Sequence, residues 1–409
     1  MESRRPKAVV AAGSGVAGAQ RRESRRPKAV VAAGSGVAGA QRRESRRPKA
    51  VVAMSGGVDS SVAAALLVEQ GYDVTGIMLK LWRGEAANLD SGCCNVGAAS
   101  DARRVADVLG IPFYVLNFAD RFEETVISNF HSDYSAGRTP NPCVRCNQWV
   151  KFDALLERAK TLGADVLATG HYARRSTHNG RHRLLRGVDR NKDQSYVLWM
   201  LDQAKLARTL FPVGDMEKSE TRRIATELGL RTATKPDSQE ICFVRNGDLG
   251  AYVDEHIPQA NQPGPIVTTT GDQVGEHRGI ARYTVGQRKG LGIALGMPLF
   301  VRSIDAESNS LVVAERAELG CDGFIVDETS FVDEPPVAGG RVLVQYRAHG
   351  EVFPAAVERV ERGCLAVSFD DPAEAVARGQ SAAFYDAEHP EILLGGGVIS
   401  ATVTAGARV

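Results

Sequence analysis

The chain has 409 residues, of which 43% are hydrophobic and 24% charged, a globular composition that excludes a wholly disordered or collagen-like protein. At about 150 residues a domain, this length predicts two or three domains. No apolar run reaches the roughly 18 residues of a membrane span, so we expect no membrane association. Seven cysteines, an odd number over a long chain, indicate a reducing compartment, and we expect a cytoplasmic protein.

The net charge of +1 hides an asymmetry along the chain. Residues 1–43 contain ten Lys and Arg against two Glu, which leaves 40 basic and 47 acidic residues, a net charge of −7, for the remainder. A nucleic-acid partner would therefore have to meet a local basic patch, because the body as a whole would repel it.

The N-terminal segment is a tandem duplication. Residues 2–22 recur letter for letter as residues 23–43, and a third copy runs from Glu44 to Ala53. Two copies with almost no large apolar side chains cannot bury a core, so we expect residues 1–48 to form a disordered basic tail. Its paired arginines leave an export signal or an organelle transit peptide as alternatives.

A glycine turn follows the duplicated segment. The pattern predicts a buried strand over 49–53, a turn over 54–58 and a helix over 59–70. Gly56 and Gly57 let backbone N–H groups converge on an anion at the helix N-terminus, and Asp59 can hold Mg²⁺. The turn lacks the Gly-Lys-Ser/Thr of a Walker loop. A plain strand-to-helix turn is the alternative.

Strands and helices continue to alternate. The predicted strands are 73–79, 112–118 and 166–169, and the predicted helices are 98–109, 122–134 and 150–162. This alternation predicts an α/β domain with a doubly wound parallel sheet. Ligands of such sheets bind at the carboxyl ends of strands, so residues 54–60, Leu79 and Gly170 could line one nucleotide pocket.

Two cysteines have contrasting surroundings. Cys146 follows a Pro-rich stretch, and Asn147 is a plausible N-cap for the helix over 150–162. Cys146 would then lie at the positive end of this helix with Arg145 beside it, conditions that favour a thiolate. Cys242 lies between acidic and apolar neighbours, which disfavour one. We therefore predict that one thiol attacks and the other carries sulfur.

A metal site is the alternative use of these thiols. An iron–sulfur cluster or zinc could in principle take ligands from Cys93, Cys94, Cys143, Cys146 and Cys242. Adjacent cysteines suit a tetrahedral chelate poorly, so we predict no metal ligands, while the question of a cluster stays open. Cys321 and Cys364 lie in strand-like stretches and are expected to be small buried hydrophobes.

Residues 171–192 are strongly basic. They contain seven cations against one acid, Asp189, and Asn179-Gly180 predicts a hairpin turn. In a body of net charge −7 we expect these cations to contact phosphates; a solvated charged hairpin is the alternative. Beyond residue 249 short Val/Ile-rich runs predict all-β modules.

Several separate motifs together resemble one family, the bacterial-type tRNA-specific 2-thiouridylases of the PP-loop ATP pyrophosphatase superfamily. The motifs are residues 53–60, 137–142, 146–147, 168–174, 191–196, 286–292, 369–372, 379–380 and 395–397. The resemblance implies a PP-loop catalytic domain over 49–248, a small central β-rich domain over 249–320 and a C-terminal β-barrel over 321–409.

The resemblance also implies an activity: ATP-dependent insertion of sulfur at the 2-position of the wobble uridine of tRNA, releasing AMP and pyrophosphate. Cys242 would receive sulfur as a persulfide from a relay donor protein, Cys146 would be the nucleophile, and the two would end as a disulfide. ATP with Mg²⁺ would be bound by Ala53, Met54, Ser55, Gly56, Gly57, Val58, Asp59, Ser60, Leu79 and Gly170. The tRNA would be contacted by Asn141, Pro142, Cys143, Lys192, Asp193, Gln194, Gln345 and Tyr346.

Two positions depart from the family pattern. Some members have Asp where Cys143 stands, and the late tRNA-contact pair, often Arg-Tyr, is Gln345-Tyr346 here, although Arg347 follows. Two rival functions are an adenylylating synthetase or amidotransferase acting on a small molecule, and a non-enzymatic tRNA-binding protein. The sequence does not specify the tRNA set, the sulfur donor or the oligomeric state.

Overall fold

The computed structural model describes residues 46–81, 96–237, 241–244, 247–348 and 350–404. The duplicated tail predicted over 1–48 lies almost wholly outside these ranges, and so do Cys93 and Cys94. Within the described ranges, no helix combines the length and the apolar character needed to cross a membrane.

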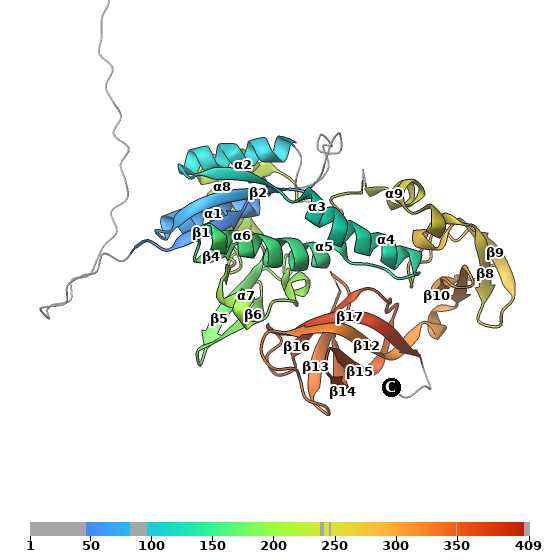
Figure 1. Cartoon of the computed structure of the whole chain (residues 1–409). Coiled ribbons are helices and arrows are strands. Elements are labelled where there is room, and N and C mark those ends of the chain that lie inside the picture. Colours follow the sequence, from blue (N-terminus) through green and yellow to red (C-terminus); the bar gives the residue numbers. More distant parts are fainter. Residues whose placement is uncertain (1–45, 82–95, 238–240, 245–246, 349, 405–409) are drawn as a thin grey trace, which may run out of the picture. The chain divides into compact units, whose positions relative to one another are not determined.

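The first domain is built on a five-stranded sheet in which every neighbouring pair is parallel (Figure 1). In the order β3-β2-β1-β4-β7, the strands are Phe113–Asn117, Asp73–Lys80, Lys49–Ala53, Val166–Ala168 and Thr209–Leu210. The chain runs outward from the central β1 to β2 and β3, then returns to β4 on the other side of β1. The predicted doubly wound sheet is confirmed.

Both faces of this sheet are covered because its strand residues alternate between two cores. Ala50 and Val52 of β1 pack in one hydrophobic cluster, and Val51 packs in the other. The first cluster is shared with α1 (Val58–Glu69), α2 (Val96–Leu109) and α8 (Lys218–Glu227). The second is shared with helices of the segment 119–161.

Two long helical stretches in that segment contain π-helical turns. The first comprises α3 (Ala119–Phe122), η2 (Glu123–Ile127) and α4 (Ser128–Ser135); the second comprises α5 (Pro142–Arg145), η3 (Cys146–Leu155) and α6 (Leu156–Thr161). The second stretch begins eight residues before the helix predicted over 150–162. Asn141 is its N-cap, accepting a hydrogen bond from the Val144 N–H at 3.2 Å, so the prediction of Asn147 as the cap is wrong.

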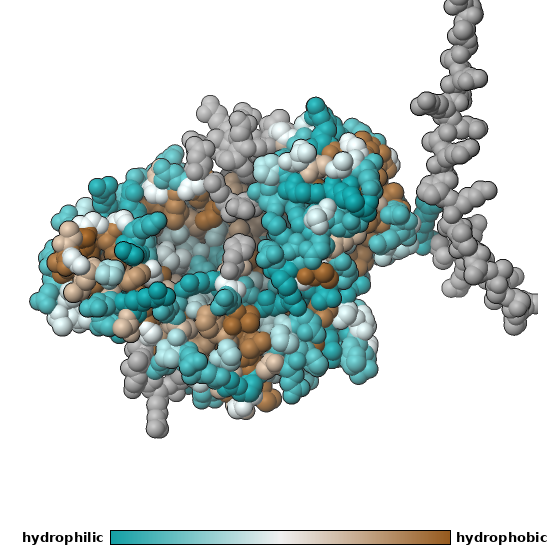
Figure 2. All heavy atoms as spheres, turned by 180° about the vertical axis from the view of Figure 1, so that it is seen from behind, coloured by the Kyte–Doolittle hydropathy of each residue, from teal (hydrophilic) through white to brown (hydrophobic). Residues whose placement is uncertain are grey.

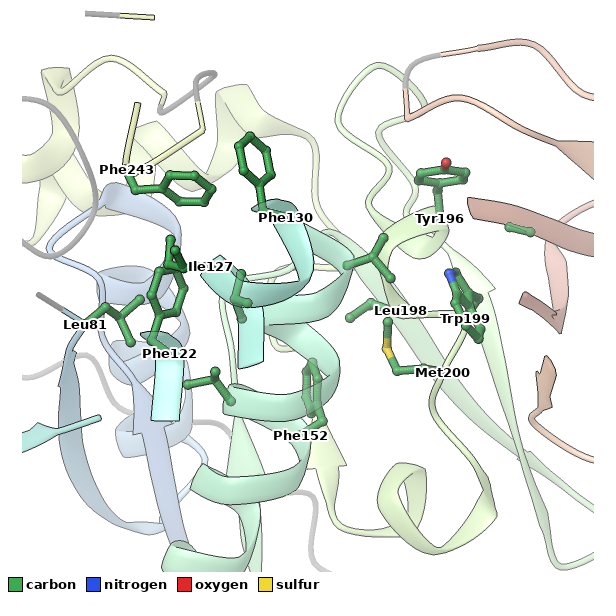
Figure 3. Close-up of a cluster of buried hydrophobic side chains, with 14 of the residues drawn as sticks. Leu81, Phe122, Ile127, Phe130, Phe152, Tyr196, Leu198, Trp199, Met200 and Phe243 are labelled. Carbon is green, nitrogen blue, oxygen red and sulfur yellow. The ribbon is translucent and has the colours of Figure 1, made fainter. Parts of the chain in front are cut away.

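The second of the two clusters extends from the sheet to the C-terminal barrel. Figure 3 shows Phe243 beside Phe130 and Phe122, with Tyr196 and Trp199 on the side of the barrel strands. The ring centroids of Phe130 and Phe243 are 4.8 Å apart in an edge-to-face arrangement. The Tyr196 hydroxyl donates a hydrogen bond to the Ser381 carbonyl at 2.8 Å. The first domain and the barrel thus share this hydrophobic cluster, while the interior of the barrel forms a separate cluster.

The central domain follows a short helix. Its sheet has the order β10-β11-β8-β9, and the strands in that order are Phe300–Asp305, Ser310–Ala314, Gly264–Thr268 and Gln273–His277. This helix is α9, Leu249–His256. The expectation that residues beyond 249 form only β modules is therefore wrong for these eight residues. Asp248 caps this helix by accepting from the Ala251 N–H at 2.9 Å.

The C-terminal domain is a closed barrel of six strands, as predicted. Its strands β12 to β17 are Gly320–Phe331, Arg341–Gln345, Phe353–Glu361, Cys364–Glu374, Ser381–Asp386 and Ile392–Thr404. They are ordered β12-β15-β14-β13-β16-β17, and β12 pairs with β17 to close the barrel. On the face drawn in Figure 2, hydrophobic residues form separate patches within a mainly hydrophilic surface.

The basic hairpin is joined to this barrel. Strands β5 (Ala173–His178) and β6 (Arg181–Arg186) form an antiparallel pair. Asn179 and Gly180 turn between them with φ of 50° and 77°, which confirms the predicted turn. Leu184 and Leu185 of β6 pair with the start of β17, so a hairpin from the first domain extends a barrel strand of the last.

Candidate nucleotide and thiol site

The glycine turn lies at the point where the sheet order reverses, between β1 and β4. A Cβ atom on Gly170, just after β4, would lie 2.6 Å from the Ser60 N atom, so only glycine permits this approach of the two loops. Gly56 has a φ of 72°, and a Cβ there would meet the Ala98 carbonyl oxygen at 2.3 Å. Leu79 is buried near the carboxyl end of β2. The structure therefore brings the predicted nucleotide residues to one edge of the sheet.

Serine hydroxyls hold the loop shape. Ser60 Oγ accepts from the Ser55 N–H at 3.2 Å and lies 3.3 Å from Ser55 Oγ. Ser61 Oγ donates to the Gly57 carbonyl at 2.7 Å. Met54 is buried against Gly76 and belongs to the core, and its N–H donates to the Ile77 carbonyl at 2.8 Å. These contacts give the loop a defined shape at the N-terminus of α1, the end of a helix that favours an anion.

The loop carboxylate, Asp59, is held by a lysine that the sequence analysis did not single out. Lys218 Nζ, from the first turn of α8, lies 2.6 Å from Asp59 Oδ1 and 2.8 Å from Asp59 Oδ2. The Tyr172 hydroxyl donates to Asp59 Oδ1 at 2.9 Å. Burial, the largest cause, raises the pKa of Tyr172, and the charge of Asp59 adds to this effect, so the phenol stays protonated.

A second carboxylate extends this network toward Cys242. Asp237 Oδ1 lies 2.8 Å from Lys218 Nζ and 3.1 Å from Arg222, and Asp237 Oδ2 accepts from Lys192 at 2.7 Å. Burial raises the pKa of Asp237, but hydrogen bonds and charge from Lys192 and Lys218 outweigh burial and lower it to about 2. Ion pairs thus connect Asp59, beside the glycine turn, to the chain segment that leads to Cys242.

Lys235 is another cation that the sequence analysis missed. Its Nζ donates to the Gly56 carbonyl at 3.0 Å and to Asp101 Oδ2 at 3.0 Å. Local patterns give no indication of Lys218 or Lys235, because both partners lie more than 130 residues away along the chain. Tyr172 could have been found, since it lies within the motif 168–174.

The structure places Cys146 in the second turn of its helical stretch. It is the first residue of the π-helical segment η3 and is half-buried. The prediction that Cys146 lies at the positive end of the helix is therefore wrong; Cys143, exposed in the first turn, lies closer to that end. The following residue, Asn147, is buried and donates to the Val197 carbonyl at 2.9 Å.

Arg145, beside Cys146, is engaged by the barrel. Its guanidinium donates to both carboxylate oxygens of Glu328 on β12, at 2.7 and 2.8 Å, and lies 4.6 Å from the Trp149 ring centroid. The hydrogen bond and charge of Arg145 lower the pKa of Glu328. Arg145 therefore fixes the helix to the barrel, and its charge is compensated.

Cys242 is half-buried in a short irregular segment between α8 and α9. Cys146 and Cys242 both pack at the margin of the hydrophobic cluster that contains Phe130 and Tyr196. Residues 238–240, which precede Ile241 and Cys242, lie outside the described ranges.

The predicted tRNA contacts of the first domain also have structural roles. Pro142 is buried behind the Asn141 cap. Asp193 Oδ1 accepts from the Gly187 and Ser195 N–H groups at 3.0 Å each, and Gln194 Oε1 accepts from the Tyr172 N–H at 3.0 Å. Lys192 is engaged with Asp237 as described above. The Asp193 carboxylate and the Gln194 amide thus shape the connection between the hairpin and η4 (Ser195–Leu198).

The predicted contacts Gln345 and Tyr346 lie in the barrel and are buried. The Gln345 amide donates to the Arg347 carbonyl at 2.9 Å and accepts from the Tyr385 hydroxyl at 3.1 Å. The Tyr346 hydroxyl donates to the Glu374 carbonyl at 3.1 Å. Of these three consecutive residues, only Arg347 is exposed.

The two cysteines of the barrel, Cys321 and Cys364, differ in burial. Cys321 is buried and donates to the Gly323 carbonyl, as expected, whereas Cys364 is only half-buried. Burial raises the pKa of both thiols. Among the residues with described positions, no group of three His, Cys, Asp or Glu side chains could hold a metal ion.

Comparison with known proteins gives matches along nearly the whole chain after the duplicated N-terminal segment. Family models match residues 48–246 (tRNA methyl transferase HUP domain), 250–315 (tRNA methyl transferase PRC-barrel domain) and 321–399 (aminomethyltransferase beta-barrel domain). The tRNA-specific 2-thiouridylase MnmA of Natranaerobius thermophilus is 45% identical over 355 residues, 85% of this chain and 96% of that protein. The chain belongs to the tRNA-specific 2-thiouridylase family.

Another 2-thiouridylase, from Carboxydothermus hydrogenoformans, is 46% identical over 84% of this chain and 94% of its own length. Among solved structures, a 4-thiouridine synthetase–RNA complex with bound ATP is 16% identical, with a TM-score of 0.34, over 52% of this chain and 50% of that one. The NMN synthetase of Francisella tularensis is also 16% identical, with a TM-score of 0.32, over 52% and 74%.

Proposed function

We propose that this protein catalyses the ATP-dependent 2-thiolation of the wobble uridine of tRNA. One arrangement supports the proposal: in a chain of the 2-thiouridylase family, the glycine turn lies at the switch point of the sheet, and both predicted reactive thiols pack against the same hydrophobic cluster. An amidotransferase or small-molecule synthetase would have no use for this pair of cysteines.

The first step would activate the base. A urea-like carbonyl is a poor electrophile, so O2 of the uridine attacks the α-phosphorus of ATP, and pyrophosphate leaves from the serine- and glycine-lined loop. Lys218 and Lys235 lie beside this loop, where their charge supports the developing negative charge. The base must leave the anticodon stack to react, which costs a few kcal/mol.

Mg²⁺ would be held at Asp59, the carboxylate of the loop. Carboxylate and hydroxyl oxygens are ligands for this ion, and the Ser55 and Ser60 hydroxyls belong to the same loop as Asp59. Because Lys218 bonds both oxygens of Asp59, the lysine must share or release the carboxylate when the ion binds. The bound ion would neutralise phosphate charge.

The second step would insert sulfur. The terminal sulfur of a Cys242 persulfide, loaded by a sulfur-relay donor protein, bonds to C2, and the C2–O bond breaks as AMP leaves. The Cys146 thiolate attacks Cys242 Sγ and breaks the S–S bond, giving 2-thiouridine and a Cys146–Cys242 disulfide. A thiol reductant then supplies two electrons and restores both thiols.

Mass spectrometry of tRNA nucleosides tests the proposal. Unmodified tRNA is incubated with the full chain, ATP, Mg²⁺, a persulfide donor and a thiol reductant, and we expect sulfur in place of oxygen in the wobble uridine. Cys146→Ser and Cys242→Ser should abolish the product, and Cys364→Ser, a half-buried thiol on the barrel, should retain it. Thiolation that survives both substitutions would refute the roles of these cysteines.

Pyrophosphate release separates the rival functions. Release stimulated by tRNA would exclude both a non-enzymatic tRNA-binding protein and a synthetase that acts on a small molecule. Release that proceeds at the same rate without tRNA would favour the synthetase.

A further inference from the structure

Residues 284–292 form a glycine-rich loop in the central domain whose motif has no assigned role in the proposed reaction. Gly286, Gly290 and Gly292 have φ of 87°, 82° and 70°, conformations that other residues rarely adopt. The base of the loop is fixed because the Gly286 N–H donates to the Val301 carbonyl at 2.8 Å and the Val301 N–H donates to the Gln287 carbonyl at 2.9 Å. The loop therefore has a defined shape.

The tip of this loop carries two exposed cations, Arg288 and Lys289. In the part of the chain that the structure describes, neither side chain makes an ion pair. The next residue, Gly290, is also exposed, so bare backbone lies beside the two cations. A polyanion can approach such a segment closely, because no Cβ atom stands in its way.

A third exposed cation lies where the loop touches the barrel. A Cβ atom on Gly286 would lie 2.3 Å from the Ala375 Cβ atom, so loop and barrel are in close contact. The Ala375 carbonyl accepts from Arg347 at 3.1 Å, and the Glu374 carbonyl accepts from the same guanidinium at 2.6 Å. Both acceptors are neutral, and the Glu374 carboxylate is engaged by Arg316 at 3.1 Å. The Arg347 guanidinium also lies 5.2 Å from the Tyr346 ring centroid, and it makes no ion pair with an acid among the described residues.

We propose that Arg288, Lys289 and Arg347 form a phosphate-binding surface for the tRNA backbone at the junction of the central domain and the barrel. The inference rests on the proposed function, which makes tRNA the substrate. In a body of net charge −7, an RNA needs a local group of available cations. Arginine and lysine bind phosphate by charge-assisted hydrogen bonds.

A protein partner is the competing occupant, since Leu295 and Met297 are exposed a few residues further along. Protein interfaces centre on buried aromatic or aliphatic anchors surrounded by a polar rim. The tip of the loop instead offers charge and bare backbone, which favours RNA.

The test compares tRNA binding by the wild-type chain and by Arg288→Gln/Lys289→Gln over a series of salt concentrations. We expect roughly tenfold weaker binding at low salt, and a slope of log K against log salt that is smaller by about 2, since two phosphate contacts are lost. Arg347→Gln should lower the slope by about 1 more. The matched control, Arg158→Gln/Arg208→Gln, removes the same charge from exposed positions on α6 and just before β7, and it should leave the slope unchanged.

Two results would overturn the proposal. One is wild-type affinity and slope in the Arg288/Lys289 variant. The other is unchanged tRNA binding with a loss of thiolation only when sulfur comes from a donor protein, which would assign the surface to that protein. If the wild-type chain itself neither binds nor thiolates tRNA, the proposed function fails, and this outcome is distinct from the other two.

Discussion

Two basic segments of this molecule use their charge in opposite ways. On the β5–β6 hairpin, Arg181 pairs with Asp333 of the barrel, and Arg186 pairs with Asp193 while its guanidinium lies 3.8 Å from the Tyr385 ring centroid. In residues 284–292, the exposed Arg288 and Lys289 make no ion pair with any residue whose position is described. A run of cations in a sequence is therefore weak evidence for phosphate contact by itself, because acids elsewhere in the fold can already bind the cations.

The hairpin expectation is accordingly weakened. Two more hairpin cations are paired with acids: Arg174 lies 4.0 Å from Asp215, and Lys192 lies 2.7 Å from Asp237. Arg183 and Arg190 make no ion pair within the described ranges, so they are the hairpin cations that remain best suited to phosphate.

Arg186→Gln should have the largest effect. Its side chain is 15% exposed, and the partner Asp193 is 6% exposed, so the substitution leaves a buried carboxylate with less compensation. We expect a loss of about 2 kcal/mol in the free energy of unfolding, measured by urea denaturation. Arg183→Gln on the same strand is the matched control and should change it by less than about 0.5 kcal/mol. Equal midpoints for both variants would mean that Arg186 is not structural.

Gly286→Ala should disturb the loop more than Gly290→Ala. Both glycines have a φ above 80°, so the backbone strain of the new side chain is matched. Only the Cβ at 286 meets the barrel, at Ala375, whereas the nearest atom to a Cβ at 290 is Gln287 Nε2 at 3.8 Å. We expect Gly286→Ala to cost about 1 kcal/mol more in stability and to weaken tRNA binding further. Identical losses would show that the loop and barrel are not in contact.

Asp237→Asn should make stability less dependent on pH at the acid end. Because Lys192 and Lys218 lower the pKa of Asp237 from its ordinary 3.8 to about 2, the carboxylate stabilises the fold above pH 3.8. This stabilisation is lost as the pH falls through about 2. The wild-type denaturation midpoint should therefore fall more steeply than that of the variant across this window. If the midpoints of the wild type and the variant changed with pH in parallel, the ion-pair network of Asp237 beside the glycine turn would be contradicted.

Arg181→Gln should have the smallest effect. Arg181 and Asp333 are 55% and 46% exposed, and such pairs contribute less than about 1 kcal/mol. We expect a small change in thermal stability that disappears at high salt, measured by calorimetry at two ionic strengths. A large change that salt does not screen would give the pair a structural role that its exposure does not suggest.

The sequence predicted the sheet well because its elements are local patterns. β1, α1 and β2 lie within one or two residues of their predicted ranges, and the Asn179-Gly180 turn forms as expected. The prediction placed the N-cap of the second helical stretch at Asn147 instead of Asn141. One local signal for the true start was present, since Asn followed by Pro is a typical helix start. Residues between Pro142 and Val150 carry no strong apolar period, which concealed the early start.

Partners far apart in the chain could not be predicted. Lys218 and Asp59 are 159 residues apart, and Arg145 and Glu328 are 183 residues apart. A single sequence specifies the type of each side chain, whereas these pairings depend on the packing of α8 beside the loop and of the barrel beside the η3 helix. The roles of Cys146 and Cys242 stay predictions for the same reason.

In the proposed reaction, the 2-carbonyl oxygen of uridine leaves as part of AMP. The experiment uses tRNA that carries a heavy oxygen isotope at uridine O2, followed by mass spectrometry of the AMP formed during thiolation. We expect the isotope in AMP in proportion to the 2-thiouridine produced. Thiolated tRNA accompanied by unlabelled AMP would contradict this reaction.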